Sequence, residues 1–421
     1  MRILKLLKFP FWGSGSGTYA RKLAEKLAKL GNDVAIVAPD DRGIRGVKIY
    51  TAKLPFFAAI TGHSEYPGCK LYSNLTPQEI NAILASFVKT ILKAVDEFKP
   101  DIIYVHHASF FTWIASYIRS IYNIPYIVIE HGTGILNSTL DRRYLTLTRD
   151  SLNHAEYIIC VSGDTKRWFQ RVYGKRHANK IRIIPGGVDS ETYKHEAPIK
   201  IISKKYQLKD KKLVIFTGKL TKPKGTEYLV KAAPKIDAEI YILGSGDELS
   251  NLQEIVKEKK IKNVHFLGYF GPEYVKELKE FYRRADVFVC PSIWDEPLGL
   301  VVLEAMASGT PVVGSKRGGI PLAIKNNVNG FLVKARSSSA IADAVNKILH
   351  DPVLRKRLSK EARKTVEEKF NWLTIAQRYE RISRNTIDIH QGKVKLTKKK
   401  LSYINVDAGK KELKGRKLDY I

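Results

Sequence analysis

The stretch DVFVCPSIWDEPLGLVVLEAMASGTPVVGSK, residues 286–316, decides the fold. Its two short apolar runs, DVFVCPS and TPVVGSK, are typical of buried β-strands. Between them, GLVVLEAMASG has the pattern of a helix that ends at Gly309, a residue type that commonly terminates helices. This order of strand, helix and strand predicts two parallel strands with a helix covering them.

The same alternation continues over most of the chain. Strand-like runs occur at RILKLLKF, DVAIVAP, IIYVHH, PYIVIEHG, YIICVS and IRIIPGG, and again at KLVIFTGKL, AEIYILGSG, VHFLGYF and GFLVKA. Residues 189–212 separate the two groups and are polar and charged, which is typical of a domain boundary. The sequence therefore predicts an α/β protein with two successive doubly wound domains, over residues 1–195 and 196–370.

Length and cysteine content narrow the class of protein. A chain of 421 residues with 44% apolar content suits two or three globular domains. Cys69, Cys160 and Cys290 form no CxxC pair, so we expect neither a disulfide framework nor a zinc site. Widely spaced cysteines without a pairing pattern indicate a protein of the reducing cytoplasm. No run reaches about 18 uncharged apolar residues, so we expect no membrane-spanning helix.

The chain is strongly basic, with 72 Lys and Arg against 42 Asp and Glu and a formal net charge of +30. Such a surface attracts anions, which include nucleic acid, acidic lipid headgroups and phosphorylated substrates. A lysine-rich surface that binds nothing in particular is the alternative. Residues 389–421 form a basic tail with ten Lys or Arg against three acids, either disordered or folded as a short hairpin.

A glycine loop follows the first predicted strand. Gly13, Gly15 and Gly17 precede a helical pattern, and such a loop lets a phosphate approach the backbone at a helix N-terminus. The spacing is GxGxG rather than GxGxxG, and no acidic residue stands in the expected place after the second strand, which argues against a nicotinamide cofactor. The lysine of a Walker A loop is also missing from the sequence here. A plain tight turn is the alternative.

Two lysines follow the first predicted strand of the second domain. Lys219 and Lys224 lie in FTGKLTKPKG, where the carboxyl end of a strand in an open α/β sheet borders the ligand site. Two cations at this place would neutralise a diphosphate. Lysines exposed to solvent would give the same sequence pattern.

Two glutamates lie within the opening stretch. Glu304 falls in an apolar helical run, where a carboxylate is costly unless it has a partner. It lies four residues after Leu300, so it points back to the helix N-terminus, and its two oxygens suit the adjacent hydroxyls of a ribose. Glu296 precedes the helix and would reach another part of the same ligand. A helix cap or an internal ion pair is the structural alternative for either residue.

Residues 296–313, EPLGLVVLEAMASGTPVV, resemble the glutamate motif of glycosyltransferase family 4, and the resemblance covers most of residues 1–385. It implies the GT-B fold, in which two Rossmann-like domains face a central cleft. It also implies that a C-terminal helix at about 371–388, seen in NWLTIAQRYERI, crosses back to the N-terminal domain. The tail from residue 389 lies outside the common core.

The resemblance implies roles for the second-domain residues. Glu304 would bind the nucleotide ribose, and Glu296 would contact hydroxyls of the donor sugar. Lys219 and Lys224 would hold the diphosphate, although the family usually has arginine in the place of Lys219. The backbone that covers the phosphate and ribose would come from Leu298, Gly299 and Leu300.

In the first domain, the resemblance assigns His131, in IEHGT, to the face of the donor sugar. The loop of Gly15, Ser16 and Gly17 would approach the diphosphate. Gly186, in IPGGVD, stands where the family usually has asparagine, which puts the contacts of that side chain in doubt.

The reaction implied is a hexosyl transfer with retention from a UDP- or GDP-linked sugar to an acceptor hydroxyl, without metal or cofactor. His131, Lys219, Lys224 and Glu296 are the catalytic candidates, and front-face displacement is the expected route. A sugar-nucleotide epimerase or hydrolase on the same scaffold is the alternative enzyme. A basic nucleic-acid-binding protein is the non-enzyme alternative, but the sequence has no RRM, zinc-finger or helix-turn-helix signature.

The sequence says less about the acceptor. KLPFFAAITG, Lys53–Gly62, is apolar and aromatic, and together with the basic surface it indicates contact with an anionic membrane. This favours a glycan or lipid-linked acceptor and a cytoplasmic protein that is peripheral on the membrane. The alternative is that this stretch packs into the core.

Overall fold

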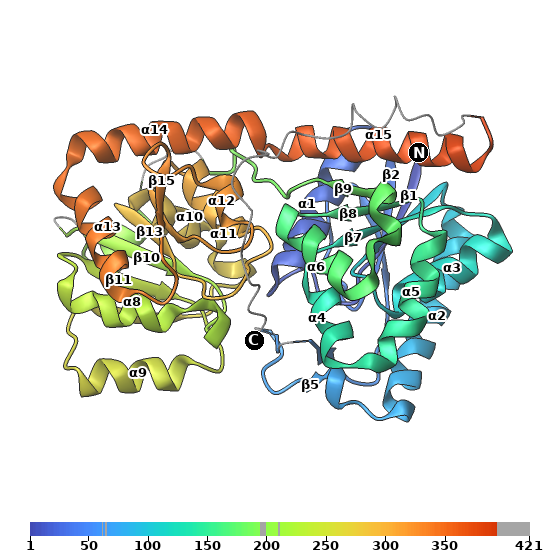
Figure 1. Cartoon of the computed structure of the whole chain (residues 1–421), viewed down its shortest axis with the longest axis horizontal. Helices are drawn as coiled ribbons and strands as arrows, with labels where there is room; N and C mark the ends of the chain where they lie inside the picture. Colours follow the sequence, from blue (N-terminus) through green and yellow to red (C-terminus); the bar gives the residue numbers. More distant parts are fainter. Residues whose placement is uncertain (61, 64, 194–198, 209–210, 394–421) are drawn as a thin grey trace. The chain divides into compact units, whose positions relative to one another are not determined.

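A computed structural model of the chain describes residues 1–60, 62–63, 65–193, 199–208 and 211–393 (Figure 1). It divides into two compact units. The first contains Met1–Gly186 and the segment that starts at Trp372, and the second contains Gly187–Asn371. The division falls a few residues before the boundary expected after residue 195. The basic tail lies outside the described residues from 394 onward.

The first unit is built on a parallel seven-stranded sheet in the order β3-β2-β1-β6-β7-β8-β9. Helices flank both faces of this sheet, which buries strands such as β6 and β7 along their whole length (Figure 1). The strands are β1 (Arg2–Leu6), β2 (Asp33–Ala38), β3 (Val47–Thr51), β6 (Ile102–His106), β7 (Tyr126–Glu130), β8 (Tyr157–Cys160) and β9 (Ile181–Ile183). The helices of the first chain segment are α1 (Gly15–Lys29), α2 (Pro77–Phe98), α3 (Phe110–Tyr122), α4 (Thr133–Leu140), α5 (Leu145–His154) and α6 (Gly163–Tyr173).

The second unit repeats the design with a parallel six-stranded sheet in the order β12-β11-β10-β13-β14-β15. Its strands are β10 (Leu213–Thr217), β11 (Glu239–Leu243), β12 (Val264–Gly268), β13 (Val287–Cys290), β14 (Val312–Ser315) and β15 (Gly330–Val333). Its helices are α7 (Ile201–Lys205), α8 (Thr226–Ala232), α9 (Leu249–Glu258), α10 (Val275–Arg284), α11 (Leu300–Ala307), α12 (Ile320–Ala323), α13 (Ser338–His350) and α14 (Pro352–Lys369). The opening stretch is β13, α11 and β14, with β13 and β14 parallel as predicted.

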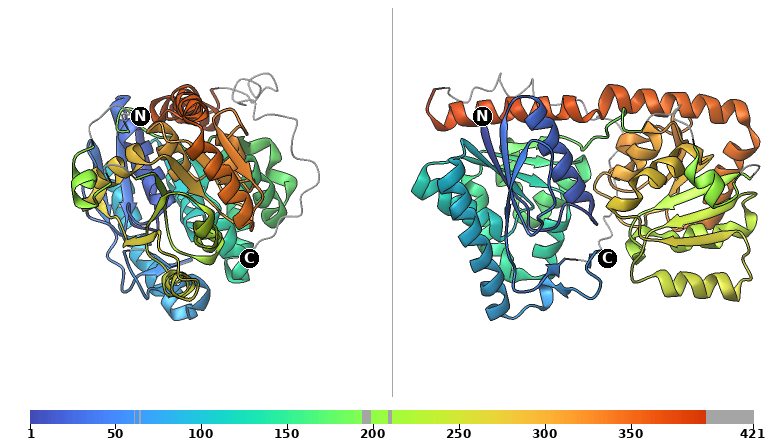
Figure 2. Two further views of the ribbon diagram at one scale, coloured as in Figure 1. Left: turned by 90° about the vertical axis from the view of Figure 1, so that its left-hand side faces the viewer. Right: turned by 180° about the vertical axis from the view of Figure 1, so that it is seen from behind.

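The chain returns to the first unit through α15, Trp372–His390. This helix packs along α1, and Figure 1 and Figure 2 show it as the long red helix. Tyr19 of α1 and Tyr379 of α15 join their hydroxyls at 2.8 Å, and the ring of Tyr19 meets Trp372 edge-on. The predicted two-domain α/β fold with a returning C-terminal helix is confirmed.

The polar stretch at 189–212 contains the short helix α7, which the sequence did not predict. The buried Glu280 of α10 accepts hydrogen bonds from the backbone N–H groups of Lys200, Ile201 and Ile202. A distant carboxylate therefore satisfies the first amides of a helix too short to be stable alone.

The apolar stretch Lys53–Gly62 is largely packed, as far as it is described. Ala58 and Ala59 form β4, which pairs with β5 (Lys70–Leu71) in a second small sheet. Phe57 stacks on Tyr66 with ring centroids 4.3 Å apart. Within this stretch, packing therefore accounts for much of the apolar surface.

Cys69, Cys160 and Cys290 are free thiols. No helix in the described part of the chain is long and apolar enough to span a membrane.

Candidate active site

The second sheet reverses its strand order between β10 and β13, and predicted donor-site residues lie at this reversal. In an open parallel sheet, the loops at the carboxyl ends of two such strands diverge and leave a crevice for a ligand. Lys219 and Lys224 follow β10, and Glu296 follows β13. The fold therefore brings residues that are far apart in sequence to one edge of the second sheet.

Lys224 and Glu296 form an ion pair at this edge. Nζ of Lys224 lies 2.6 Å from Oε2 of Glu296, and the same oxygen accepts hydrogen bonds from Trp294 Nε1 at 3.2 Å and Ser292 Oγ at 3.3 Å. Burial disfavours the charge on Lys224, but the Glu296 carboxylate outweighs burial and raises the pKa of Lys224. Lys224 therefore stays a cation at neutral pH. The side-chain donors from described residues all reach Oε2, which leaves Oε1 for a ligand.

Close backbone contacts that require glycine join the loop after β13 to the loops after β10 and β14. Gly225 has φ +64°, and a Cβ atom on it would lie 2.3 Å from the carbonyl oxygen of Pro291. A Cβ atom on Gly318, at φ +51°, would lie 2.3 Å from the carbonyl oxygen of Glu296. That oxygen also accepts a hydrogen bond from Gly319 N at 2.6 Å. The backbone around the ion pair is thus fixed from both sides.

Glu304 is tied to the same edge through a tyrosine. Tyr282 OH donates to Oε2 of Glu304 at 2.9 Å and lies 2.6 Å from Oγ1 of Thr217, the last residue of β10. Burial, and then the Glu304 carboxylate, raises the pKa of Tyr282, so its hydroxyl keeps its proton. The carboxylate expected in an apolar helix therefore has a partner, and it is half-buried rather than sealed in the core.

Leu298, Gly299 and Leu300 form the entry to α11. Gly299 is the N-cap residue at φ +74°, a conformation that favours glycine, and Leu300 is the first helical residue. The first N–H groups of a helix have no acceptor within it. These amides are therefore able to bind phosphate or ribose oxygens next to Glu296.

The predicted glycine loop of the first unit lies largely inside α1. Ser14 is the N-cap, and its hydroxyl accepts the N–H of Gly17 at 3.1 Å, so α1 begins at Gly15 and includes Ser16 and Gly17. A Cβ atom on Gly17 would lie 2.4 Å from the carbonyl oxygen of Pro10, whereas nothing lies within 4 Å of one on Gly15. Gly17 therefore serves close packing, and the amides of Gly15 and Ser16 form the open start of the helix.

His131 follows β7, next to the point where the first sheet reverses its strand order between β1 and β6. Its Nε2 lies 2.9 Å from Nδ1 of His106, and Tyr19 meets its ring edge-on at 4.7 Å. Burial, and then the charge of Lys5, lowers the pKa of His131 to about 3, so the ring is neutral at neutral pH. The residue is 9% exposed, so it is not fully sealed from a ligand.

Glu130 holds the two loops beside His131. Its Oε1 accepts the N–H of Ala108, and its carboxylate also bonds the N–H of Gly132. Burial raises the pKa of Glu130 to about 7, against the effect of these amides and of the Lys8 charge. The carboxylate thus joins the loop after β6 to the loop after β7.

Sequence reasoning missed four residues that support these sites. Tyr282 lies in α10, and Asp295 lies in the loop between β13 and α11. Asp295 accepts the N–H of Gly318 at 3.1 Å. A lone tyrosine or aspartate has no motif that marks it, so only its neighbours in space reveal its role. His106 and Glu130 could have been found, because each lies at the end of an apolar strand and directly before a histidine, in IIYVHH and IVIEHG.

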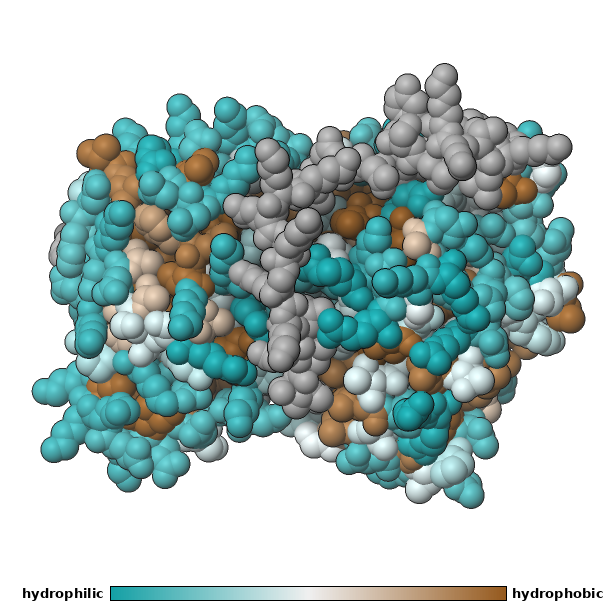
Figure 3. Space-filling view, in the orientation of Figure 1, coloured by the Kyte–Doolittle hydropathy of each residue, from teal (hydrophilic) through white to brown (hydrophobic). Residues whose placement is uncertain are grey.

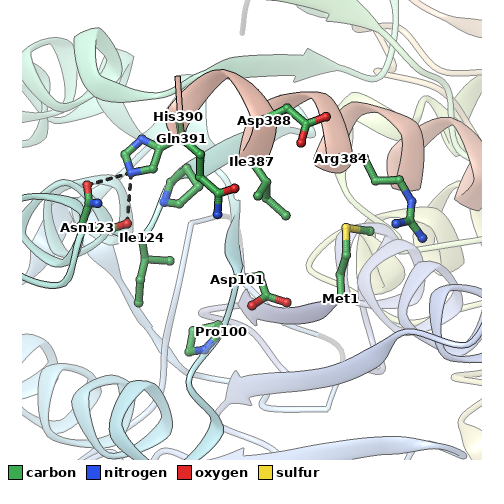
Figure 4. Close-up of a pocket in the computed structure, with 11 residues that line it drawn as sticks. Met1, Pro100, Asp101, Asn123, Ile124, Arg384, Ile387, Asp388, His390 and Gln391 are labelled. Carbon is green, nitrogen blue, oxygen red and sulfur yellow. Dashed lines mark hydrogen bonds between the residues drawn. The ribbon is translucent and has the colours of Figure 1, made fainter. Parts of the chain in front are cut away.

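A cavity of about 470 Å³ lies at the opposite edge of the first sheet (Figure 4). Met1 and Asp101, which line it, precede β1 and β6, so it borders the amino ends of the strands. Two of its polar residues have partners: Asp101 accepts from Arg2, and His390 Nε2 lies 2.9 Å from Oδ1 of Asn123. This cavity lies between α15 and the amino ends of the strands, whereas open α/β sheets bind ligands at the carboxyl ends.

No group of three or more His, Cys, Asp or Glu side chains that could hold a metal ion occurs within the described ranges of the chain. The metal-free reaction stays a prediction.

Two family models match the chain and together span most of it. The model for glycosyltransferase family 4 matches residues 13–192, and the model for group 1 glycosyl transferases matches residues 198–365. The uncharacterized glycosyltransferase MJ1607 of Methanocaldococcus jannaschii is 29% identical over 386 residues, which cover 86% of this chain and 92% of that protein.

Solved structures share the fold. Sucrose-phosphate synthase from Thermosynechococcus elongatus has a TM-score of 0.76 at 23% identity, over 92% of this chain and 100% of that one. Anabaena Alr3699/HepE in complex with UDP-glucose has a TM-score of 0.72 at 20% identity, over 91% of this chain and 100% of that one. These structures show the GT-B fold, and the two family models together show that the chain belongs to the family 4 and group 1 glycosyltransferases, as an enzyme of the hexosyltransferase class.

Proposed function

We propose that the protein transfers a hexose, with retention of configuration, from a nucleotide diphosphate sugar to an acceptor hydroxyl. The observation that carries the proposal is the Lys224–Glu296 pair at 2.6 Å, set at the strand reversal of the second sheet and before the N-terminus of α11. A cation and a carboxylate with one open oxygen suit the two ends of such a donor. Lys224 faces the diphosphate, and Oε1 of Glu296 accepts hydroxyls of the sugar.

Charge that builds on the leaving diphosphate is the main obstacle to the reaction. Lys219, Lys224 and the first amides of α11 stabilise that charge without a metal ion or cofactor, and the ion pair with Glu296 holds Lys224 in place before the bond breaks. The acceptor hydroxyl attacks from the face that the leaving group departs from, and a phosphate oxygen takes its proton. Glu296 then serves as a binding group rather than as a nucleophile.

A uridine donor is the first choice. It is supported by the fold shared with Alr3699/HepE, whose solved complex holds UDP-glucose. The residues discussed above contact ribose, phosphate and sugar, which most nucleotide sugars have in common. A GDP-linked sugar is therefore the second choice.

The acceptor in this proposal is a glycan or lipid-linked precursor at the cytoplasmic face of an anionic membrane. The net charge of +30 supports it, since each Lys or Arg close to such a membrane contributes about 1 kcal/mol. Hydrophilic side chains predominate on the face of each unit seen in Figure 3, which suits electrostatic rather than inserted binding. Co-sedimentation with vesicles of neutral lipid alone or with anionic lipid tests this part. Binding only to anionic vesicles, and its loss in high salt, is the expected result.

The donor is tested by thermal shift and by nucleotide release. We expect UDP-glucose or another UDP-hexose to raise the melting temperature more than GDP- or ADP-sugars do. Release of UDP should depend on an added acceptor. Release at the same rate without an acceptor would favour a hydrolase, and conversion of the donor into another nucleotide sugar would favour an epimerase.

A further inference from the structure

A second histidine lies against His131. His106 is the last residue of β6, and His131 directly follows the neighbouring strand β7. The two rings are within 6° of parallel, and Nδ1 of His106 lies 2.9 Å from Nε2 of His131. His106 is fully buried. The pair is therefore a fixed hydrogen bond between two imidazoles rather than a chance contact at the surface.

Both rings are neutral at neutral pH. Burial, followed by the charge of Lys5, lowers the pKa of each histidine. Lys5 is itself buried in β1, where its Nζ donates to the carbonyl oxygen of Ala20 at 2.7 Å. Two neutral imidazoles that share a hydrogen bond have one proton between the bonded nitrogens, so two arrangements are possible.

The two arrangements leave different atoms at the far edges of the rings. If His131 donates, the proton of His106 sits on its Nε2, and Nδ1 of His131 is a bare acceptor. If His106 donates, its Nε2 is a lone pair, and Nδ1 of His131 carries a proton.

The surroundings of His106 favour the second arrangement. Its Nε2 is buried and has no hydrogen-bond partner among the described residues. A buried N–H without an acceptor loses the free energy of its hydration, and orphaned buried N–H groups are rarer in proteins than unsatisfied acceptors. Nδ1 of His131, in contrast, has no partner among the described residues and is not fully buried, so its proton can reach a ligand.

We propose that His106 is a positioning residue, which donates its Nδ1 proton to His131 and so makes Nδ1 of His131 a hydrogen-bond donor toward the donor sugar. The proposal rests on the proposed function, because it takes the sugar as the ligand of His131. It excludes His131 as a general base, since the exposed nitrogen already carries a proton. It also predicts that the sugar contact at this place is an oxygen that accepts a hydrogen bond.

The tautomer of His131 is measured directly by NMR of the full-length protein with ¹⁵N-labelled histidine. His131→Asn assigns the signals of this residue by their loss. We expect a protonated Nδ1 and a bare Nε2 at His131 in the protein without ligand. A protonated Nε2 would overturn the proposal, and this measurement does not depend on any activity.

Variants at His106 test its effect on the reaction. His106→Phe keeps a ring but removes the proton donor, and we expect it to lower kcat/KM for the sugar nucleotide about tenfold and to change the His131 tautomer. In His106→Asn, the side-chain amide N–H replaces Nδ1–H, so it should restore most of the activity and the wild-type His131 spectrum. His177→Phe, a buried histidine outside this cluster, is the matched control and should change neither.

The outcomes separate this proposal from the proposed function. A folded His106→Phe with wild-type kinetics and spectrum overturns the positioning role. A folded His106→Asn whose kcat/KM is as low as that of His106→Phe overturns it as well. If the predicted tautomer and its change in His106→Phe are found but no sugar nucleotide is used, the positioning of His131 stands and the proposed function fails.

Discussion

At the scale of single residues, the candidate donor site depends on how its carboxylates are partnered. Oε2 of Glu296 accepts from Lys224, Trp294 and Ser292, and Glu304 accepts from Tyr282. A carboxylate in a mostly buried position is costly without such donors. These bonds hold each carboxylate in one orientation before a ligand arrives, which reduces the entropy lost on binding.

Replacing Lys224 tests the role of its charge. Lys224→Ala removes the cation assigned to the leaving diphosphate, so kcat and kcat/KM should both fall by about 100-fold or more. Lys222 is an exposed lysine in the same loop and gives a matched control. Steady-state UDP release with acceptor is the measurement. Equal losses in Lys222→Ala and Lys224→Ala would mean that the loop contributes only general positive charge.

Glu304→Gln tests the ribose contact. The amide keeps the shape of the side chain but replaces one acceptor oxygen by a donor, so the KM for the sugar nucleotide should rise about tenfold, or about 1.4 kcal/mol. The kcat should change much less, since ribose lies away from the bond that breaks. A KM equal to that of the wild type would remove Glu304 from the ribose site.

At the scale of elements, the start of α1 shows what the sequence could and could not predict. The glycine pattern predicted a turn followed by a helix, and both are present. It did not predict that Ser14 would cap the helix, so that Gly15 and Gly17 lie in the first turn. The local pattern does not reveal that Gly17 meets the backbone of Pro10, because that contact is made by the path of the chain before the helix.

Alanine substitutions at the two glycines separate packing from helix propensity. Gly17→Ala should destabilise the protein by about 1–3 kcal/mol, because its Cβ atom would overlap the carbonyl oxygen of Pro10. Gly15→Ala has open space at the same helix end and should be neutral or slightly stabilising. Urea unfolding followed by circular dichroism compares the two. A similar loss in both variants would show that close packing is not the reason for Gly17.

At the scale of the whole molecule, the sequence predicted the fold well because buried parallel strands are apolar along their whole length. The sequence also placed Lys224, Glu296 and His131 after strands, where the structure has them, while their roles stay predictions. Tyr282 and Glu280 were not, since each acts on a segment that lies far away along the chain. The sequence pattern gave little sign that α7 would form, because its first amides depend on that distant carboxylate.

Several buried histidines predict how stability depends on pH. Burial lowers the pKa of His131 to about 3 and of His177 to about 4, and it lowers the pKa of His106 and His107 well below the ordinary value. Below about pH 6.5 these histidines bind protons in the unfolded chain but not in the folded one, so their contribution to stability falls as the pH drops. Glu130, whose pKa the fold raises to about 7, has the opposite slope and offsets about one of the four histidines.

Each such histidine contributes up to about 1.4 kcal/mol per pH unit to this slope. The slope is measured by urea unfolding between pH 7 and pH 5. His106→Phe should reduce it, whereas His154→Asn, at an exposed position, should leave it unchanged. An equal slope in the wild type and His106→Phe would show that His106 is not held neutral by the fold.

Retaining hexosyl transfer is tested by the anomeric configuration of the first product formed from an α-linked UDP-hexose and an acceptor. It is followed in real time by ¹H NMR, with Lys224→Ala as the control for background chemistry. We expect an α-linked product from the first time points, formed by the wild type and almost absent with Lys224→Ala. A β-linked first product, or equal product with both proteins, would contradict it.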